Sequence, residues 1–281
     1  MHNELIAIIF GLGSALTIAW GTVIRHRLSS TIPSGASTSA GVHRVIASPI
    51  WWAGVLLAMT GYALQIAALA FGTLLLVQPL LVLKLMFTLP LAAKFSGQAI
   101  SRGELFWASV LTGTVAIIVI SGRPLPGEAS ASIWVWLPAF LVGTLIFALL
   151  YWTADHSPRR RKALLLGVAT GWLYGFVAVL SKAVVDVYTH QGLSSMVLSW
   201  ELWLLIFLSL AGVWVQQAAF NAASLEASLP SMTSVEPIVA FVLGYLLLGE
   251  RFQAAGLEWI LLLGAMAAMV WSVAELSRRS V

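Results

Sequence analysis

Apolar runs of about 20 residues recur nine times along this chain of 281 residues. A run of this length crosses the hydrocarbon core of a bilayer as an α-helix, because in lipid a single segment can satisfy its backbone hydrogen bonds internally only as a helix. The predicted spans lie near residues 4–24, 50–70, 72–93, 104–121, 132–152, 163–187, 200–221, 227–248 and 256–275. The sequence therefore predicts an all-α integral membrane protein with nine transmembrane helices.

The composition agrees with a polytopic membrane domain. Hydrophobic residues make up 60% of the chain and charged residues 9%, whereas soluble proteins carry about 25% charged residues. No long polar block interrupts the spans, so we expect one domain over residues 1–281. Cysteine is absent, which excludes disulfides and thiolate metal sites. The net charge is +4, and its basic residues lie in short loops beside apolar segments, where they determine membrane topology. We therefore expect no nucleic-acid partner.

Lysine and arginine are distributed unequally between the two sets of loops. Two basic residues, Arg123 and Arg251, lie in one set, and eleven lie in the other. The eleven are Arg25, Arg27, Arg44, Lys94, Arg102, Arg159, Arg160, Arg161, Lys162, Arg278 and Arg279. Because cytoplasmic loops are enriched in these residues, we expect a protein of the cytoplasmic (inner) membrane with its N-terminus outside and its C-terminus in the cytoplasm.

An internal repeat relates the two halves of the chain. The segment Gly61-Tyr-Ala-Leu-Gln65 in the second span matches Gly212-Val-Trp-Val-Gln216 in the seventh, and Val77-Gln78-Pro79 in the third matches Val235-Glu236-Pro237 in the eighth. We therefore expect repeat one at 1–124, a linking helix at 130–155 and repeat two at 163–277. Four helices in each half with one between them would make the two repeats inverted, a common plan in transporters, whose substrate sites lie at the repeat interface near the bilayer midplane.

Glu236 is the residue that most strongly indicates a functional site. An ionisable group deep in an apolar span costs about 2.5–3.5 kcal/mol on insertion scales, and such groups normally face a cavity or a partner. Its counterpart in the repeat is Gln78, and Lys84 follows six residues later in the same span. Lys84 could be the counter-ion of Glu236 or a ligand for an anionic substrate group. The alternative interpretation of Glu236 is a structural carboxyl paired with a lysine.

Other polar and aromatic residues within the spans are secondary candidates for the site. They are Gln65, Gln216 and Asn221, which could orient a substrate, and Trp20 and Trp214, which could form pocket walls. Hydrogen bonds between helices are the alternative explanation for the polar residues. Lys182 and Asp186 lie four residues apart, on one face of the sixth span near its outer end, and we expect an exposed interfacial pair there.

Pro79 and Pro237 occupy matching positions beside the two central polar residues. Each proline removes a backbone donor and so frees a carbonyl four residues earlier, that of Leu75 and that of Thr233. These positions are candidates for kinks or gating elements, with freed carbonyls as ligands wherever they face a cavity. A kink required only for packing is the alternative.

Signatures of an enzyme are missing from the sequence. We find no His/Asp/Glu cluster at metal-ligand spacing, no phosphate-binding glycine loop followed by lysine, and no Ser/His/Asp set. We therefore expect no catalytic activity, no cofactor and no resident metal, although coupling of transport to H⁺ or another ion remains open.

Three stretches resemble a known superfamily. The run VEPIVAFVLGYLLLGERF resembles the second-half signature of the drug/metabolite transporter (DMT) superfamily, whose EamA-type members end this helix with Gly-Glu-Arg. The stretches SPIWWAGVLLAMTGYALQIAALAFGTLLLVQPLLVLKLMF and GLGSALTIAWGTVIRHRL are similar to the first half of NIPA-type magnesium transporters of that superfamily, which also have nine helices. The resemblance implies transport of small organic metabolites, lipid-linked or amphipathic substrates, or Mg²⁺.

The chain departs from the NIPA-type pattern at the second span. NIPA-type proteins have an acidic residue after the glycine there, whereas Tyr62 follows Gly61 here. Mg²⁺ prefers several hard oxygen ligands, so one carboxylate opposed by Lys84 is a poor magnesium site.

We therefore expect a secondary transporter that moves a small polar or amphipathic organic metabolite by alternating access. Alternatives are a NIPA-type Mg²⁺ transporter, a flippase for a lipid-linked substrate and a non-transporting partner protein of the envelope. The expected partners are a small-molecule substrate and membrane lipids, and the sequence is compatible with a homodimer.

Overall fold

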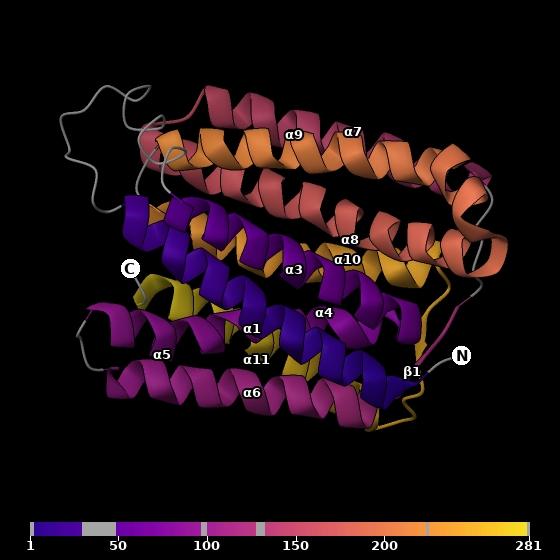
Figure 1. Cartoon of the computed structure of the whole chain (residues 1–281), viewed down its shortest axis with the longest axis horizontal. Coiled ribbons are helices and arrows are strands. Elements are labelled where there is room, and N and C mark those ends of the chain that lie inside the picture. Colours follow the sequence, from indigo (N-terminus) through magenta and orange to yellow (C-terminus); the bar gives the residue numbers. More distant parts are fainter. Residues whose placement is uncertain (1–2, 30–48, 97–99, 128–132, 223–224, 280–281) are drawn as a thin grey trace.

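The computed structural model describes residues 3–29, 49–96, 100–127, 133–222 and 225–279, and they form an almost entirely helical bundle (Figure 1). The helices run roughly along one common axis, and the two termini lie at opposite ends of the bundle. We call the end that holds Asn3 the N-terminal end. The first loop with Arg44 and residues 130–132 of the predicted linking helix lie outside the described residues.

Ten helices and two very short strands make up the described residues. The first-half elements are α1 (Glu4–Ser29), α3 (Pro49–Phe71), α4 (Leu74–Val82), α5 (Lys84–Ser96), α6 (Arg102–Gly122) and β1 (Pro124–Leu125). They are followed by α7 (Ile133–Asp155), α8 (Arg159–Leu198), α9 (Trp200–Ala222), α10 (Leu225–Leu247), β2 (Arg251–Phe252) and α11 (Glu258–Arg279).

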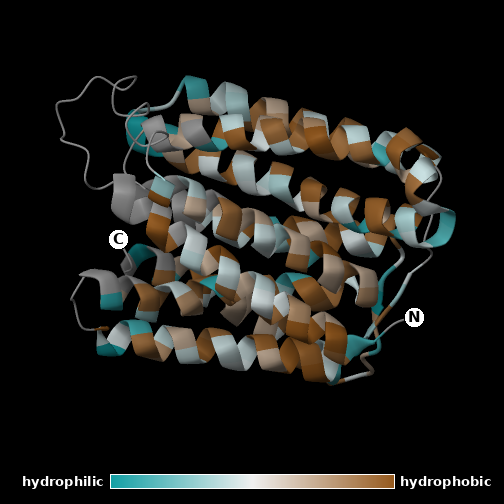
Figure 2. Ribbon diagram, viewed as in Figure 1, coloured by the Kyte–Doolittle hydropathy of each residue, from teal (hydrophilic) through white to brown (hydrophobic). Residues whose placement is uncertain are grey.

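The helices are those of a multi-pass membrane protein. Seven segments among the described residues are long and apolar enough to cross a membrane, and Trp200–Gln216 and Ser231–Leu247 are shorter apolar helices. Hydrophobic residues recur along the length of the helices (Figure 2), and Ile120, Leu145 and Trp134 are each more than two-thirds exposed. Exposed apolar surface on this scale is unusual for a soluble monomer and indicates contact with lipid.

The predicted third span, 72–93, is divided into α4 and α5 at Leu83. Pro79 lies inside α4, and the division comes four residues after it, where the Leu83 N–H donates to the Leu80 carbonyl instead of to Pro79. Lys84 is therefore the first residue of α5, at a break in the helix.

The sixth predicted span, 163–187, continues beyond its expected end. Helix α8 extends to Leu198, and its regular geometry is interrupted at Gly192, whose φ of 84° is in the left-handed region that glycine adopts readily.

Helices α4 and α10 lie at the centre of the bundle. All nine residues of α4 are buried. Leu75 and Leu76 of α4 and Phe241 of α10 belong to one apolar cluster, with α1, α5, α6 and α11. Leu74 of α4 and Val239 of α10 belong to a second cluster, with α3, α7 and α8. The two helices thus join the two apolar clusters.

A two-residue antiparallel ribbon, which the sequence analysis did not predict, lies at the N-terminal end. Pro124 of β1 pairs with Phe252 of β2, and Leu125 pairs with Arg251. The ribbon joins the segment that leaves α6 to the segment between α10 and α11 (Figure 1).

Candidate functional site

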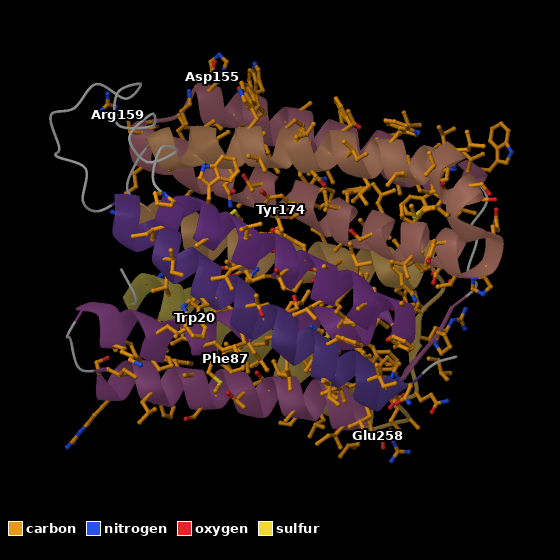
Figure 3. All side chains as sticks on the ribbon, in the orientation of Figure 1. Trp20, Phe87, Asp155, Arg159, Tyr174 and Glu258 are labelled. Atoms are coloured by element: carbon orange, nitrogen blue, oxygen red, sulfur yellow. The ribbon has the colours of Figure 1, made fainter. Side chains whose placement is uncertain are left out.

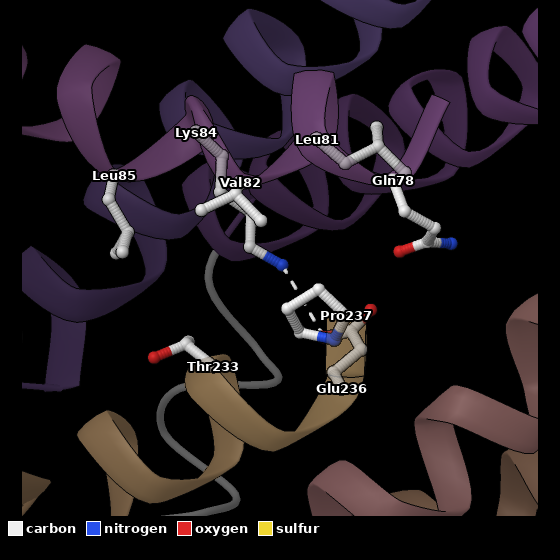
Figure 4. A pocket seen from close by; sticks show the side chains of 8 residues that line it. All are labelled: Gln78, Leu81, Val82, Lys84, Leu85, Thr233, Glu236 and Pro237. Carbon is white, nitrogen blue, oxygen red and sulfur yellow. Dashed lines mark ion pairs between the residues drawn. The ribbon is translucent and has the colours of Figure 1, made fainter. Parts of the chain in front are cut away.

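Glu236 and Lys84 face each other across a small pocket between α4, α5 and α10 (Figure 4). The pocket is lined by Gln78, Leu81, Val82, Lys84, Leu85, Thr233, Glu236 and Pro237. Glu236 comes from the middle of α10, and Lys84 comes from the start of α5. Two polar groups that are far apart in sequence therefore meet at the centre of the bundle.

The distance between the two charged groups is longer than a hydrogen bond. Lys84 Nζ lies 3.8 Å from Glu236 Oε2, and the two side chains are 27% and 20% exposed. A direct N–H···O bond would be about 2.7–3.2 Å long. The pair is thus held by Coulomb attraction. The ammonium group of Lys84 can still donate, and the carboxylate of Glu236 can still accept, a hydrogen bond with a third group.

Gln78 adds an unpaired donor to the same pocket. Its side chain is 1% exposed, and its Nε2 has no hydrogen-bond partner among the described residues. The Oγ of the buried Ser234 on α10 is also unpaired among these residues. Buried polar atoms are nearly always paired in native proteins, so an unpaired amide that faces a pocket is available to bind a third group.

The pocket is very small in this conformation. Its volume is about 10 Å³, which is roughly the space for one water molecule. An organic ligand would enter only after α4, α5 and α10 separate, whereas a proton or a water molecule fits already.

The remaining candidates from the sequence do not line this pocket. The Gln216 amide accepts from the Tyr174 hydroxyl at 3.3 Å and donates to Met232 Sδ at 3.2 Å, so its bonds join α8, α9 and α10. Gln65 lies on α3, outside the pocket lining. Asn221 lies at the end of α9, and its side chain is outside the described part of the structure.

The two predicted wall tryptophans are exposed. Trp20 of α1, labelled in Figure 3, is 45% exposed, and Trp214 of α9 is 64% exposed and stacks on Tyr151. In this conformation both contribute to the outer surface of the bundle and not to the pocket.

The two prolines differ in their surroundings. Pro237 lines the pocket beside Glu236, and α10 is continuous through it. Pro79 is buried in α4 next to Gln78 and is not among the lining residues.

The described residues contain no group of three or more His, Asp or Glu side chains that could hold a metal ion. The polar side chains of the pocket are one carboxylate, one amide, one hydroxyl and one ammonium group. This donor set is poor for Mg²⁺, which takes six oxygen ligands and is repelled by an ammonium group.

Glu250 is a buried carboxylate that sequence reasoning treated only as part of a motif. It follows α10, is 1% exposed, and accepts hydrogen bonds from the backbone N–H groups of Leu74 (2.8 Å) and Leu75 (2.9 Å). These N–H groups belong to the first turn of α4, where the helix dipole favours an anion. Burial raises the pKa of Glu250 to about 7, although the two N–H bonds and Lys182 lower it.

The expected exposed pair of Lys182 and Asp186 is in fact largely covered, with Lys182 buried and Asp186 partly buried. Lys182 Nζ lies 3.0 Å from Asp186 Oδ1 and donates to the Leu69 carbonyl of α3 at 2.7 Å, and the two side chains are only 6% and 14% exposed. The expectation was wrong because α3 covers this face of α8, which the spacing of the two residues could not reveal.

Comparison with known proteins gives one full-length relative and one distant one. An uncharacterized protein of Corynebacterium glutamicum is 50% identical over 281 residues, which cover 100% of this chain and 97% of the relative. The chain belongs to the family of that protein. The chain is also distantly similar to a probable magnesium transporter, NIPA3, of Arabidopsis thaliana, at 23% identity over 230 residues, or 77% of this chain and 61% of the plant protein.

No protein-family model matches this chain, and no solved structure matches it.

Proposed function

We propose that the chain is a secondary transporter that moves a small polar or amphipathic organic metabolite across the cytoplasmic membrane by alternating access. In this proposal, nine helices form two inverted repeats of the DMT type, with the N-terminus outside. The protein acts on its substrate by transport and not by catalysis.

The observation that carries the proposal is the polar pocket at the crossing of α4, α5 and α10. A carboxylate, an ammonium group and an unpaired amide meet there inside an apolar bundle. Polar groups inside a membrane are costly and typically mark a substrate or ion pathway. Their meeting point between a first-half and a second-half helix suits a site at a repeat interface.

The chemistry of the pocket favours a substrate that carries polar groups of both signs. Glu236 suits a cationic group, Lys84 suits an anionic group, and the Gln78 Nε2 suits a hydrogen-bond acceptor. The small volume of the pocket means that such a substrate would bind as the helices separate.

Transport of Mg²⁺ is the second candidate, and it is supported by the similarity to the plant NIPA3 protein. The single carboxylate and the nearby Lys84 count against it, since Mg²⁺ binding would require Lys84 to move away or lose its proton.

Thermal unfolding of the purified protein in nanodiscs tests both candidates. The panel contains MgCl₂ and metabolites that carry an ammonium group, a carboxylate or both. Compounds that stabilise the protein are then assayed by isotope uptake into proteoliposomes, and Mg²⁺ entry is followed with a trapped dye. We expect an organic compound to stabilise the native protein against unfolding and to enter proteoliposomes that contain it. With Glu236→Gln we expect neither effect.

The matched control is Asp155→Asn, which removes the carboxylate of an exposed ion pair with Lys162. This variant should transport like the native protein. Uptake that is unchanged in Glu236→Gln would refute the proposed site, whereas Mg²⁺ entry that requires Glu236 would favour the second candidate.

A further inference from the structure

Glu250 connects the two halves of the chain at the N-terminal end of the bundle. Its carboxylate comes from the segment after α10, and both of its hydrogen-bond donors belong to the start of α4. The two oxygens take one N–H each, at 2.8 and 2.9 Å, so that a single side chain fastens the end of α10 to the beginning of α4.

The backbone around Glu250 is arranged to hold the carboxylate in this place. Gly249 has a φ of 64°, a left-handed conformation that turns the chain back after α10, and the Glu250 N–H donates to the Gly244 carbonyl at 3.2 Å. Arg251 pairs with Leu125 in the ribbon. Gly127 lies so close that a Cβ there would be 1.6 Å from the Leu248 carbonyl oxygen. The segment is thus fixed on both sides of Glu250.

The Glu250 contact and the pocket are two separate connections between the same pair of helices. Leu74 and Lys84 are ten residues apart, which corresponds to about 15 Å along a helix. Because Glu236 contacts Lys84 and Glu250 contacts Leu74, α10 runs antiparallel to α4. The Glu250 contact holds the two helices together at the N-terminal end, so their separation from that end towards the pocket would have to break it.

Charged groups around Glu250 make its protonation state important. Among the described residues, those that act on it are Lys182 and Asp186 of α8, whereas α4 contributes only backbone N–H groups. Glu250 and Lys182 are buried, and the Asp186 side chain is 14% exposed. The group of three carries one net negative charge when Glu250 is ionised and none when Glu250 is protonated. A buried net charge is costly, so this cluster favours a bound proton.

We propose that Glu250 is the proton-binding site of a latch at the N-terminal end, where the protonated carboxyl keeps α4 and α10 together and its ionisation allows them to separate. The inference rests on the proposed function, since a transporter has to open the interface between these helices. The pocket carboxylate Glu236 is a different group with a different role.

The direction of the effect follows from the two pKa values. The pKa of Glu250 is about 7 in the closed latch, against 4.5 for an ordinary solvated carboxyl. The closed form therefore binds the proton more tightly, and rising pH shifts the equilibrium towards opening until the closed form itself is ionised above about pH 7.

Cysteine labelling can test the latch because the chain has no native cysteine. Val77→Cys places a thiol on α4 at a position that is 0% exposed, and Leu257→Cys gives a reference thiol at a position that is 83% exposed. Each variant is labelled in nanodiscs with a water-soluble maleimide. The labelling rate of Val77→Cys is divided by that of Leu257→Cys, which corrects for the effect of pH on ionisation of a thiol. We expect the ratio to rise about tenfold between pH 6 and pH 8.

Glu250→Gln in the Val77→Cys background should remove this pH dependence, because an amide does not titrate. Since Glu250→Gln could fail to fold, the same titration is made with Glu236→Gln, in which the pH dependence should persist. A flat ratio in the native background, a pH response retained in Glu250→Gln, or one lost in Glu236→Gln would each overturn the proposal. The assay needs no substrate, so failure of the latch and failure of the transport hypothesis are distinguishable.

Discussion

Lys84 Nζ and Glu236 Oε2 lie 3.8 Å apart, close enough to attract each other but too far apart for a direct hydrogen bond. Lys84 begins α5 at the break after Leu83, so its backbone position depends on how the third predicted span is divided. Glu236 lies within the continuous α10. A small displacement of α5 would therefore change the separation of the two charges, as binding of a charged substrate between them would require.

The first prediction concerns the separate contributions of this pair to stability and to transport. Lys84→Met and Glu236→Gln should each lower the free energy of unfolding by about 1–2 kcal/mol, because each leaves a partly buried charge unpaired. The double variant should regain most of that loss but no transport. Thermal unfolding and uptake of the same preparations check this. Recovery of transport in the double variant would show that the pair is only structural.

The second prediction concerns the unpaired amide of Gln78. Replacing a buried, unsatisfied donor with an apolar group of similar size removes a penalty of about 1–3 kcal/mol, so Gln78→Leu should not destabilise the protein and should raise its unfolding temperature. If the amide binds substrate, the same variant should lose uptake. Gln65→Leu on α3 is the matched control, since Gln65 does not line the pocket, and it should keep uptake. A fall in unfolding temperature for Gln78→Leu would indicate that its Nε2 is paired in the membrane.

Part of this site could be predicted from the sequence, because Glu236, Lys84 and Gln78 interrupt apolar spans. Their depth alone marks them as candidates, and the repeat suggested that α4 and α10 are related. The structure brings these three side chains to one pocket. The orientation of Trp20 and Trp214 could not be predicted, since a membrane helix is apolar on its lipid-facing side and its protein-facing side alike.

The burial of Glu250 could not be predicted from the sequence, for a different reason. A carboxylate just after an apolar helix is ordinarily a solvated loop residue, and its burial depends on the start of α4, 176 residues away in sequence. The same holds for Lys182, which bonds to a carbonyl 113 residues away. The signal that could have indicated Glu250 is Gly249, because a glycine that ends a helix turns the chain back towards the bundle.

The third prediction follows from the raised pKa of Glu250. The pKa of Glu250 is about 7 in the native state and near 4.5 in the unfolded state. The contribution of its proton to the free energy of unfolding is therefore fully present below pH 4.5 and is lost as the pH rises to about 7. The loss should amount to about 3 kcal/mol, levelling off above pH 7. Unfolding temperatures measured from pH 5 to pH 8 should fall more steeply for the native protein than for Glu250→Gln. Equal slopes would contradict the burial of a titrating carboxylate at this position.

The fourth prediction concerns the packing of the segment after β1 against the latch. A Cβ at Gly127 would lie 1.6 Å from the Leu248 carbonyl oxygen, which cannot move without displacing Gly249 and Glu250. Gly127→Ala should therefore destabilise the protein by about 1–3 kcal/mol and raise the labelling of Val77→Cys at pH 6. Gly113→Ala on α6 is the matched control: a Cβ there meets nothing within 4 Å, and alanine is the better helix former, so its stability should be unchanged or higher. If the two variants unfold at the same temperature, the segment around Gly127 does not hold Glu250 in place, and the latch would depend on Gly249 and the ribbon alone.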